Sequence, residues 1–82
     1  MISKVMRLLG KEKLSKIKIK ESFKQHTPKA EKMAMKLLFY ERHGKFSQTI
    51  VVDKDNFLVD GYTTYIIAKS LNKKYMPVKR EE

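Results

Sequence analysis

Residues 49–65 read TIVVDKDNFLVDGYTTY, and this stretch decides the fold. The run from Thr49 to Val52 is rich in β-branched residues, which is typical of a strand covered on both faces. Asp53 to Asn56 has the residue types of a tight turn, and Phe57 to Val59 is apolar again. The pattern predicts a β-hairpin in which the two apolar runs pair through that turn.

The hairpin leads into a predicted helix and a last strand. Gly61 ends the hairpin, and Tyr62 to Leu71 follows as a helix with Asn72 as its C-terminal cap. Tyr75 to Val78 is then a strand, and Pro77 restricts it to a sheet edge or a strand end because proline lacks an N–H. The helix residues available to the core are Tyr65, Ile66, Ala68 and Leu71.

A longer helix is predicted ahead of the hairpin. His26-Thr27-Pro28 predicts its start, because Thr27 can cap free N–H groups and Pro28 suits the first turn. Gly44 predicts its end. Apolar residues recur at the helical spacing of one buried face: Ala30, Met33, Ala34, Leu37 and Leu38.

The remaining segments give weaker patterns. Met1 to Leu9 fits a strand or a short helix, and Lys11 to Lys16 reads as a charged connection. Lys16 to Lys20 alternates lysine with isoleucine, as a half-buried strand does, with its lysines facing water or a ligand. Residues 80–82 are expected to be a frayed tail. The elements make one domain over residues 1–82, of the α+β class, with a mixed sheet and two principal helices.

The composition restricts the function. Cysteine is absent, which excludes disulfides, thiolate metal sites and thiol nucleophiles. No apolar run approaches the roughly 20 residues that span a bilayer, and Lys4 and Arg7 interrupt the start as they would not interrupt a signal sequence. A cytoplasmic protein without a membrane partner is therefore expected.

The net charge is +10, from nineteen Lys and Arg against nine Asp and Glu. Such a charge attracts polyanions, but the alternative is that the excess lysine only keeps a small protein soluble.

Five motifs stand in a defined order along the chain. They are Thr27-Pro28-Lys29, Gly44, Ile50-Val51-Val52-Asp53, the run from Leu58 to Tyr65, and Met76-Pro77-Val78. Over about residues 15–79 this order resembles the family of ParB N-terminal domains and sulfiredoxin. The resemblance implies a small ParB-like domain.

The same resemblance shows what is missing. After the hairpin, the partition proteins have glycine-glutamate-arginine-arginine, which holds a nucleotide triphosphate, and sulfiredoxin has glycine-cysteine-histidine-arginine, which supplies the nucleophile. This chain has Gly61-Tyr62-Thr63-Thr64 there. The lack of cysteine excludes thiol chemistry, and the lack of the arginines and the glutamate argues against triphosphate binding and metal-assisted hydrolysis of the family kind. No catalytic residue and no cofactor are predicted.

The backbone of this segment still offers an anion site, since free N–H groups and the helix dipole attract negative charge to a helix N-terminus. The alternative is structural, with Asp60 or Thr63 capping the helix and Tyr62 packing. The candidate phosphate or nucleotide ligands are Asp60, Gly61, Tyr62, Thr63 and Thr64, joined by Lys29 if the family's arrangement holds.

No metal site is predicted. His26 and His43 lie at opposite ends of the first helix, roughly 25 Å apart at about 1.5 Å per residue. Asp53, Asp55 and Asp60 lack the remaining ligands of a divalent-metal site, and turn preference explains them.

A basic stripe on the first helix is the leading candidate site. Lys32, Lys36, Phe39 and His43 share one side at helical spacing, and Lys29 joins them at one end. Lysines there would hold phosphates, and Phe39 would stack a base. The alternative is a solvated lysine face with Phe39 covered by the N-terminal segment. The strand lysines Lys16, Lys18 and Lys20 extend the basic surface.

These features favour non-enzymatic nucleic-acid binding through phosphate contacts, with little sequence specificity and with DNA favoured over RNA. Two alternatives stay open. One is a nucleotide-binding or phosphotransfer domain with its site at Asp60 to Thr64, and the other is an adaptor whose basic face docks on an acidic protein.

Overall fold

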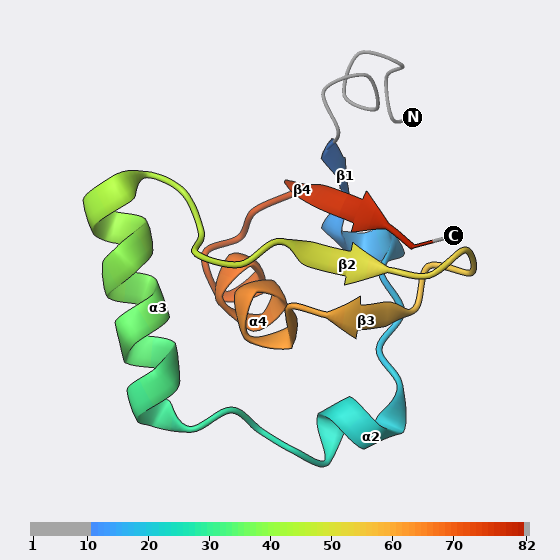
Figure 1. The fold of residues 1–82 in the computed structure, drawn as a ribbon, viewed down its shortest axis with the longest axis horizontal. Coiled ribbons are helices and arrows are strands. Elements are labelled where there is room, and N and C mark those ends of the chain that lie inside the picture. Colours follow the sequence, from blue (N-terminus) through green and yellow to red (C-terminus); the bar gives the residue numbers. More distant parts are fainter. Residues whose placement is uncertain (1–10, 82) are drawn as a thin grey trace.

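A computed structural model describes residues 11–81, so the strand or helix predicted over Met1 to Leu9 lies outside the described residues. The described chain forms a four-stranded mixed sheet in the order β1-β4-β2-β3 (Figure 1). The two outer pairs are antiparallel, and the central pair of β4 and β2 is parallel. The strands are β1 (Lys11–Lys13), β2 (Ile50–Val52), β3 (Leu58–Asp60) and β4 (Tyr75–Arg80).

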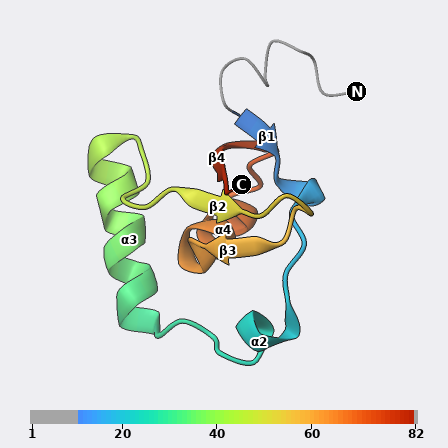
Figure 2. The same cartoon turned by 45° about the vertical axis from the view of Figure 1, so that its right-hand side comes forward.

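The described residues also form one 3₁₀ turn and three α-helices. They are the 3₁₀ turn η1 (Leu14–Lys16), the short α2 (Glu21–Lys24), the long α3 (Ala30–His43) and α4 (Tyr62–Ser70). α4 packs behind the sheet, whereas α3 lies to one side of it in both views (Figure 1, Figure 2). The predicted α+β class, with a mixed sheet and two principal helices, is confirmed, and α2 is an addition that the sequence pattern did not predict.

The predicted hairpin is present as β2 and β3. Val52 pairs with Leu58, and the Asp53 N–H donates to the Phe57 carbonyl at 2.9 Å. The Asp53 carboxylate closes the turn by accepting from the N–H groups of Asp55 and Phe57, both at 2.9 Å. These bonds, that from Phe57 above all, lower the pKa of the Asp53 carboxyl. An aspartate therefore suits this position of the turn.

The prediction that Pro77 restricts the last strand to a sheet edge or a strand end is wrong in both forms. β4 lies between β1 and β2, and Pro77 is in its middle. Its first half pairs with β1, where Lys11 is opposite Pro77, and its second half pairs with β2 from Val78 onward. Pro77 therefore stands where one ladder ends and the other begins, so its missing N–H interrupts neither.

The core lies between the sheet and α4. Ile50 and Val52 of β2 are at most 1% exposed, and Leu58 of β3 is equally buried. The prediction of a strand covered on both faces is correct for one face only, because Val51, which points to the opposite face, is half-buried. The other buried apolar residues come from the turn after β1, from α4 and from β4: Leu14, Ile17, Ile67, Ala68 and Met76.

α4 buries the predicted face only in part: Ala68 is 0% exposed and Tyr65 packs against the core, as predicted. Leu71 was expected in the core but is 40% exposed, because the helix ends at Ser70. Thr64 can be buried in the core because its hydroxyl has a hydrogen-bond partner: it donates to the Gln48 carbonyl at 3.1 Å. The residues of α4 that are buried are Thr63, Thr64, Ile67 and Ala68.

α3 begins and packs differently from the prediction. It starts at Ala30 with Lys29 as N-cap and no side-chain cap, so neither the Thr27 cap nor the start at Pro28 is correct. Its end is correct: Gly44 is left-handed at φ 70°, and its N–H donates to the Tyr40 carbonyl.

The predicted buried face of α3 is wrong. No residue of α3 is buried, and Ala30, Ala34 and Leu38 are exposed. The reason is the position of the helix, which lies to one side of the sheet, packs on α4 and contacts the loop before β2 through Lys36 and Tyr40. Its half-buried residues are Met33, Lys36, Leu37, Phe39 and Tyr40.

The two ends of the described chain also differ from expectation. Lys11 to Lys16 forms β1 and η1 rather than a connection. The predicted strand from Lys16 to Lys20 is reduced to one bridge, in which Lys18 pairs with Phe57. Arg80 is not frayed, since its guanidinium donates to the Asp53 carbonyl and to Glu12 at 3.0 and 2.6 Å.

Candidate nucleic-acid interface

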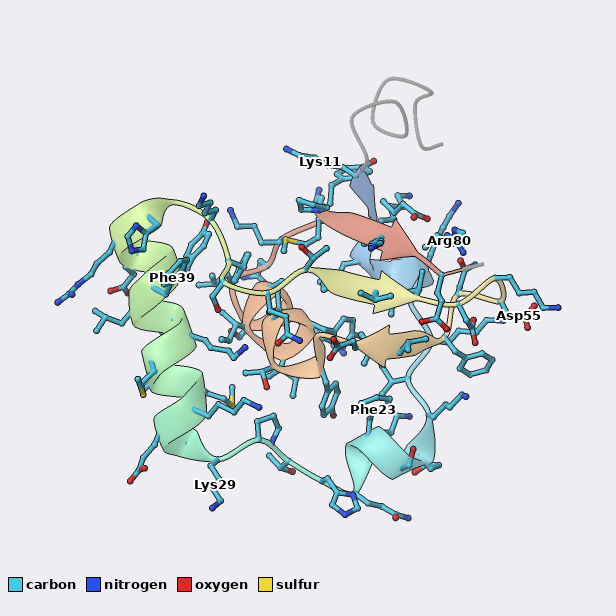
Figure 3. The ribbon with its side chains drawn as sticks, viewed as in Figure 1. Lys11, Phe23, Lys29, Phe39, Asp55 and Arg80 are labelled. Carbon is cyan, nitrogen blue, oxygen red and sulfur yellow. The ribbon has the colours of Figure 1, made fainter. Side chains whose placement is uncertain are left out.

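The basic stripe predicted on α3 lines a shallow groove. Lys29, Lys32, Lys36 and Phe39 line this cavity of about 480 Å³ together with Ser47 of the following loop, Met35 and one acid, Glu31. The His43 ring lies beyond it, 4.2 Å from the Phe39 ring between centroids. The structure thus brings the five predicted stripe residues onto one part of the surface, with Lys29 and Phe39 toward opposite ends of the helix (Figure 3).

Lys36 also links α3 to the start of α4. Its ammonium donates to Gln48 Oε1 at 2.9 Å, and Gln48 Nε2 donates to Asp60 Oδ1 at 2.9 Å. Gln48 carries no charge, so the positive charge of Lys36 is not neutralised by this contact. α3 is therefore tied to the second predicted site by a polar chain.

The second predicted site, at the start of α4, depends on Gly61. This residue is left-handed at φ 87°, and a Cβ there would lie 2.8 Å from the Thr49 carbonyl oxygen and 2.9 Å from Ile50 Cα. Glycine is therefore required for both conformation and space. The Gly61 N–H donates to Asp60 Oδ1 at 2.9 Å, which places a carboxylate at the helix terminus.

The other residues of this site have structural contacts. Thr63 and Thr64 are 6% and 1% exposed, and the Thr64 hydroxyl is engaged with Gln48 as described above. The Tyr62 ring packs 5.3 Å from Phe23 and 6.4 Å from Tyr65 between centroids. Lys29, at the far end of α3, points away from the rest of the molecule (Figure 3).

The strand lysines gather around one aromatic ring. The ammonium groups of Lys18 and Lys20 lie 5.3 and 5.7 Å from the centroid of Phe57. Lys16 is apart from them in η1 and is exposed. Cation–π contacts of this kind hold lysines in place without neutralising their charge.

Among residues 11–81, no three His, Cys, Asp or Glu side chains gather closely enough to hold a metal ion. In the same residues, no helix is long and apolar enough to cross a membrane.

Sequence reasoning missed a second group of lysines. Lys73 and Lys74 precede Tyr75 in the loop from α4 to β4, and the fold places further lysines beside them. The Lys-Lys-Tyr order was a local signal. The neighbours, which come from β1, α4 and the loop after α3, could not be found without the sheet order.

Comparison with known proteins gives a result at the level of the fold. No protein-family model matches the chain, and no curated protein matches it. Among solved structures, the chain is similar to a Pnob8-like ParB-N domain, with a TM-score of 0.70 and 21% sequence identity. The similarity covers 85% of this chain and 28% of that one, so this chain spans little more than a quarter of that protein's length. The chain has the ParB-like fold that the order of its motifs predicts.

Proposed function

We propose that the chain is a non-enzymatic nucleic-acid-binding domain that holds phosphates on lysine side chains, with DNA as its main partner. The observation that carries the proposal is the groove along α3, which Lys29, Lys32 and Lys36 line together with Phe39. Lysines that neutralise phosphates give affinity without sequence readout, and a neighbouring aromatic ring offers a stacking surface.

The distribution of ion pairs supports the proposal. Among residues 11–81 the ion pairs are Lys24 with Glu21 and Arg80 with Glu12. The lysines of the groove are in neither pair, so their charge is available to an external anion. The net charge of +10 adds long-range attraction for a polyanion.

The test is the salt dependence of binding to a DNA duplex. Replacing Lys32 and Lys36 together by glutamine should lower the log–log salt slope by roughly 1.8, because each phosphate contact in duplex DNA contributes about 0.9. Glutamine is a good helix former, so α3 should stay intact. Fluorescence anisotropy at several salt concentrations measures the slope, and an unchanged slope and affinity would contradict the proposal.

Two further variants sharpen the test. Lys54→Gln in the β2–β3 turn removes one charge far from the groove and should lower the slope less than either groove lysine does. Phe39→Ala should weaken single-strand binding by about 1–3 kcal/mol with little change in slope if the ring stacks a base. A loss of stability without a loss of affinity would assign Phe39 to packing.

A nucleotide site at the start of α4 is the second candidate. The observation that favours it is Gly61, whose missing Cβ lets the chain turn directly into the helix, and free N–H groups at a helix N-terminus attract an anion. The Asp60 carboxylate at the same terminus opposes a second anion, so this candidate ranks behind the groove. Calorimetric titration with CTP and ATP tests it, and saturable binding lost on Thr63→Val would establish it. Binding of acidic peptides but of no nucleic acid would instead support an adaptor.

A further inference from the structure

Two cavities meet at the loop between α4 and β4. One has a volume of about 370 Å³ and is bounded by the end of α3, β2 and β4. The other, of about 840 Å³, lies between η1 and the end of α4. Lys73 and Tyr75 line both cavities, so these are neighbours on one surface, the Lys73 surface.

The lining of the Lys73 surface is strongly basic. It includes no aspartate and no glutamate, and none of its lysines takes part in an ion pair within residues 11–81. The lysines are Lys11, Lys13, Lys45, Lys69, Lys73 and Lys74.

The topology gathers these lysines from separate parts of the chain. β1 pairs with the first half of β4, which places Lys13 opposite Tyr75 and Lys11 opposite Pro77. Lys45 follows the end of α3. A helix C-terminus attracts cations, which would explain lysines at the end of α4 alone. It does not explain the lysines that come from β1, so a shared external anion is the better account.

The backbone of the central loop is fixed on both sides. Asn72 is left-handed at φ 58°, and the Lys73 N–H donates to the Ala68 carbonyl at 3.0 Å, which completes a helix C-cap. The Lys74 carbonyl accepts from the Leu14 N–H at 2.9 Å. Because both lysines have an ordered backbone before any ligand arrives, less entropy is lost on binding.

Aromatic rings alternate with the lysines. The Lys73 ammonium lies 5.3 Å from the Tyr40 ring centroid, and the Lys69 ammonium lies 6.0 Å from that of Tyr65. Tyr75 is half-buried beside Lys74. Lysines interleaved with aromatic rings are typical of surfaces that bind single strands, where lysines follow the backbone and rings stack on exposed bases.

The geometry points to single-stranded nucleic acid as the ligand of the Lys73 surface, with phosphates on its lysines and bases against Tyr65 and Tyr75. The bases of a duplex are stacked inside it and cannot enter two adjacent cavities, whereas those of a single strand can. The inference deepens the proposed function and rests on it for the class of ligand, but it uses no residue of the α3 groove.

The test compares a labelled 12-nucleotide oligothymidine with a 12-base-pair duplex by fluorescence anisotropy over a range of salt concentrations. Lys73→Gln/Lys74→Gln should lower the single-strand slope by about 1.4, since each contact contributes about 0.7. The duplex slope should change little. Lys54→Gln/Lys79→Gln removes the same charge elsewhere and is the matched control. Circular dichroism and thermal melting verify that each variant is folded.

A second variant tests the stacking separately. Tyr75→Val keeps a good strand former and should weaken oligothymidine binding roughly 5- to 150-fold with an unchanged slope, the range found for a lost base stack. If this variant does not fold, the Lys73→Gln/Lys74→Gln variant still tests whether the Lys73 surface binds single strands.

The outcomes separate this inference from the proposed function. If Lys32→Gln/Lys36→Gln weakens binding and Lys73→Gln/Lys74→Gln does not, the groove stands and the Lys73 surface is overturned. Equal losses for single strand and duplex at the Lys73 surface would overturn its preference for single strands. Competition by polyglutamate as effective as that by oligothymidine would assign the surface to an acidic protein and overturn the inference as well.

Discussion

The two longer helices differ in what they contribute to the domain. α4 buries four of its side chains. In the sheet that it packs against, Ile50 of β2 is 0% exposed. α3 is longer but buries none, and its Met35 is 73% exposed. Because apolar burial is the main stabilising term, α4 and the sheet supply the stability. α3 adds little burial, and its Lys32 is exposed while its Lys36 is half-buried.

The largest expected effect contrasts the two regions directly. Ile50→Ala should destabilise the domain by about 2–5 kcal/mol, because it leaves a cavity in the core. Leu38→Ala on α3 should cost about 0.5 kcal/mol or less, because that side chain is already 46% exposed. Urea unfolding measures both. Similar losses in the two variants would show that α3 buries a face not visible in the isolated chain.

The two left-handed glycines give the next contrast. Alanine in this conformation costs about 1–2 kcal/mol at either position. Gly44→Ala adds no clash, since nothing lies within 4 Å of the new Cβ, whereas Gly61→Ala meets the Thr49 carbonyl at 2.8 Å. The clash should add about 1–3 kcal/mol, so Gly61→Ala should be the worse variant by that amount in urea unfolding. Equal costs would mean that the chain around Gly61 can shift.

The features that the sequence predicted correctly are those that neighbouring residues determine. The Asp53 turn, the strand end at Gly61 and the helix ends at Gly44 and Asn72 all depend on backbone conformations that few residue types adopt. Such preferences act over a few residues, so the local sequence contains them.

The errors concern what packs against what. Helical spacing shows that α3 has an apolar side, but not that the sheet would be covered by α4 instead. The burial of Thr63 and Thr64 depends on the Gln48 carbonyl, which is distant in sequence. The central position of β4 and the grouping of Lys11 with Lys73 follow from strand order. Each of these needs contacts that no local pattern specifies.

For the candidate sites the same division holds. That Lys29, Lys32 and Lys36 lie along one side of α3 could be predicted, because spacing on a helix determines which side chains are neighbours. The link from Lys36 through Gln48 to Asp60 was not predicted, because its three residues come from three segments.

A smaller effect is expected where that link joins the two regions. Gln48→Ala removes both side-chain hydrogen bonds and should cost roughly 0.5–1.5 kcal/mol, the usual net value for such bonds. Amide hydrogen exchange in α3 should become faster, while that in β2 should change only in proportion to global stability. Gln25→Ala, at an exposed glutamine after α2, is the control. Unchanged exchange in α3 would mean that packing against α4 is sufficient to hold it.

The smallest expected effect is a pH dependence located in the hairpin rather than in α3. The pKa of Asp53 is lowered in the folded protein, chiefly by the N–H of Phe57, and further by Asp55 and by the charges of Lys20 and Arg80. The folded state therefore releases this proton at lower pH than the unfolded chain does. The stabilisation is fully present above the unfolded pKa of about 4 and is lost as the pH falls through the folded value. Asp53→Asn keeps an oxygen that accepts the same N–H bonds but cannot titrate, so its deficit relative to the parent should be largest near neutral pH and should shrink below about pH 4. Urea unfolding between neutral and acid pH measures this difference.

Because hydrogen bonds rather than distant charges are the main cause, most of the difference should persist in about 1 M salt, where the Debye length is only about 3 Å. A deficit that disappears in salt would assign the effect to Lys20 and Arg80 instead.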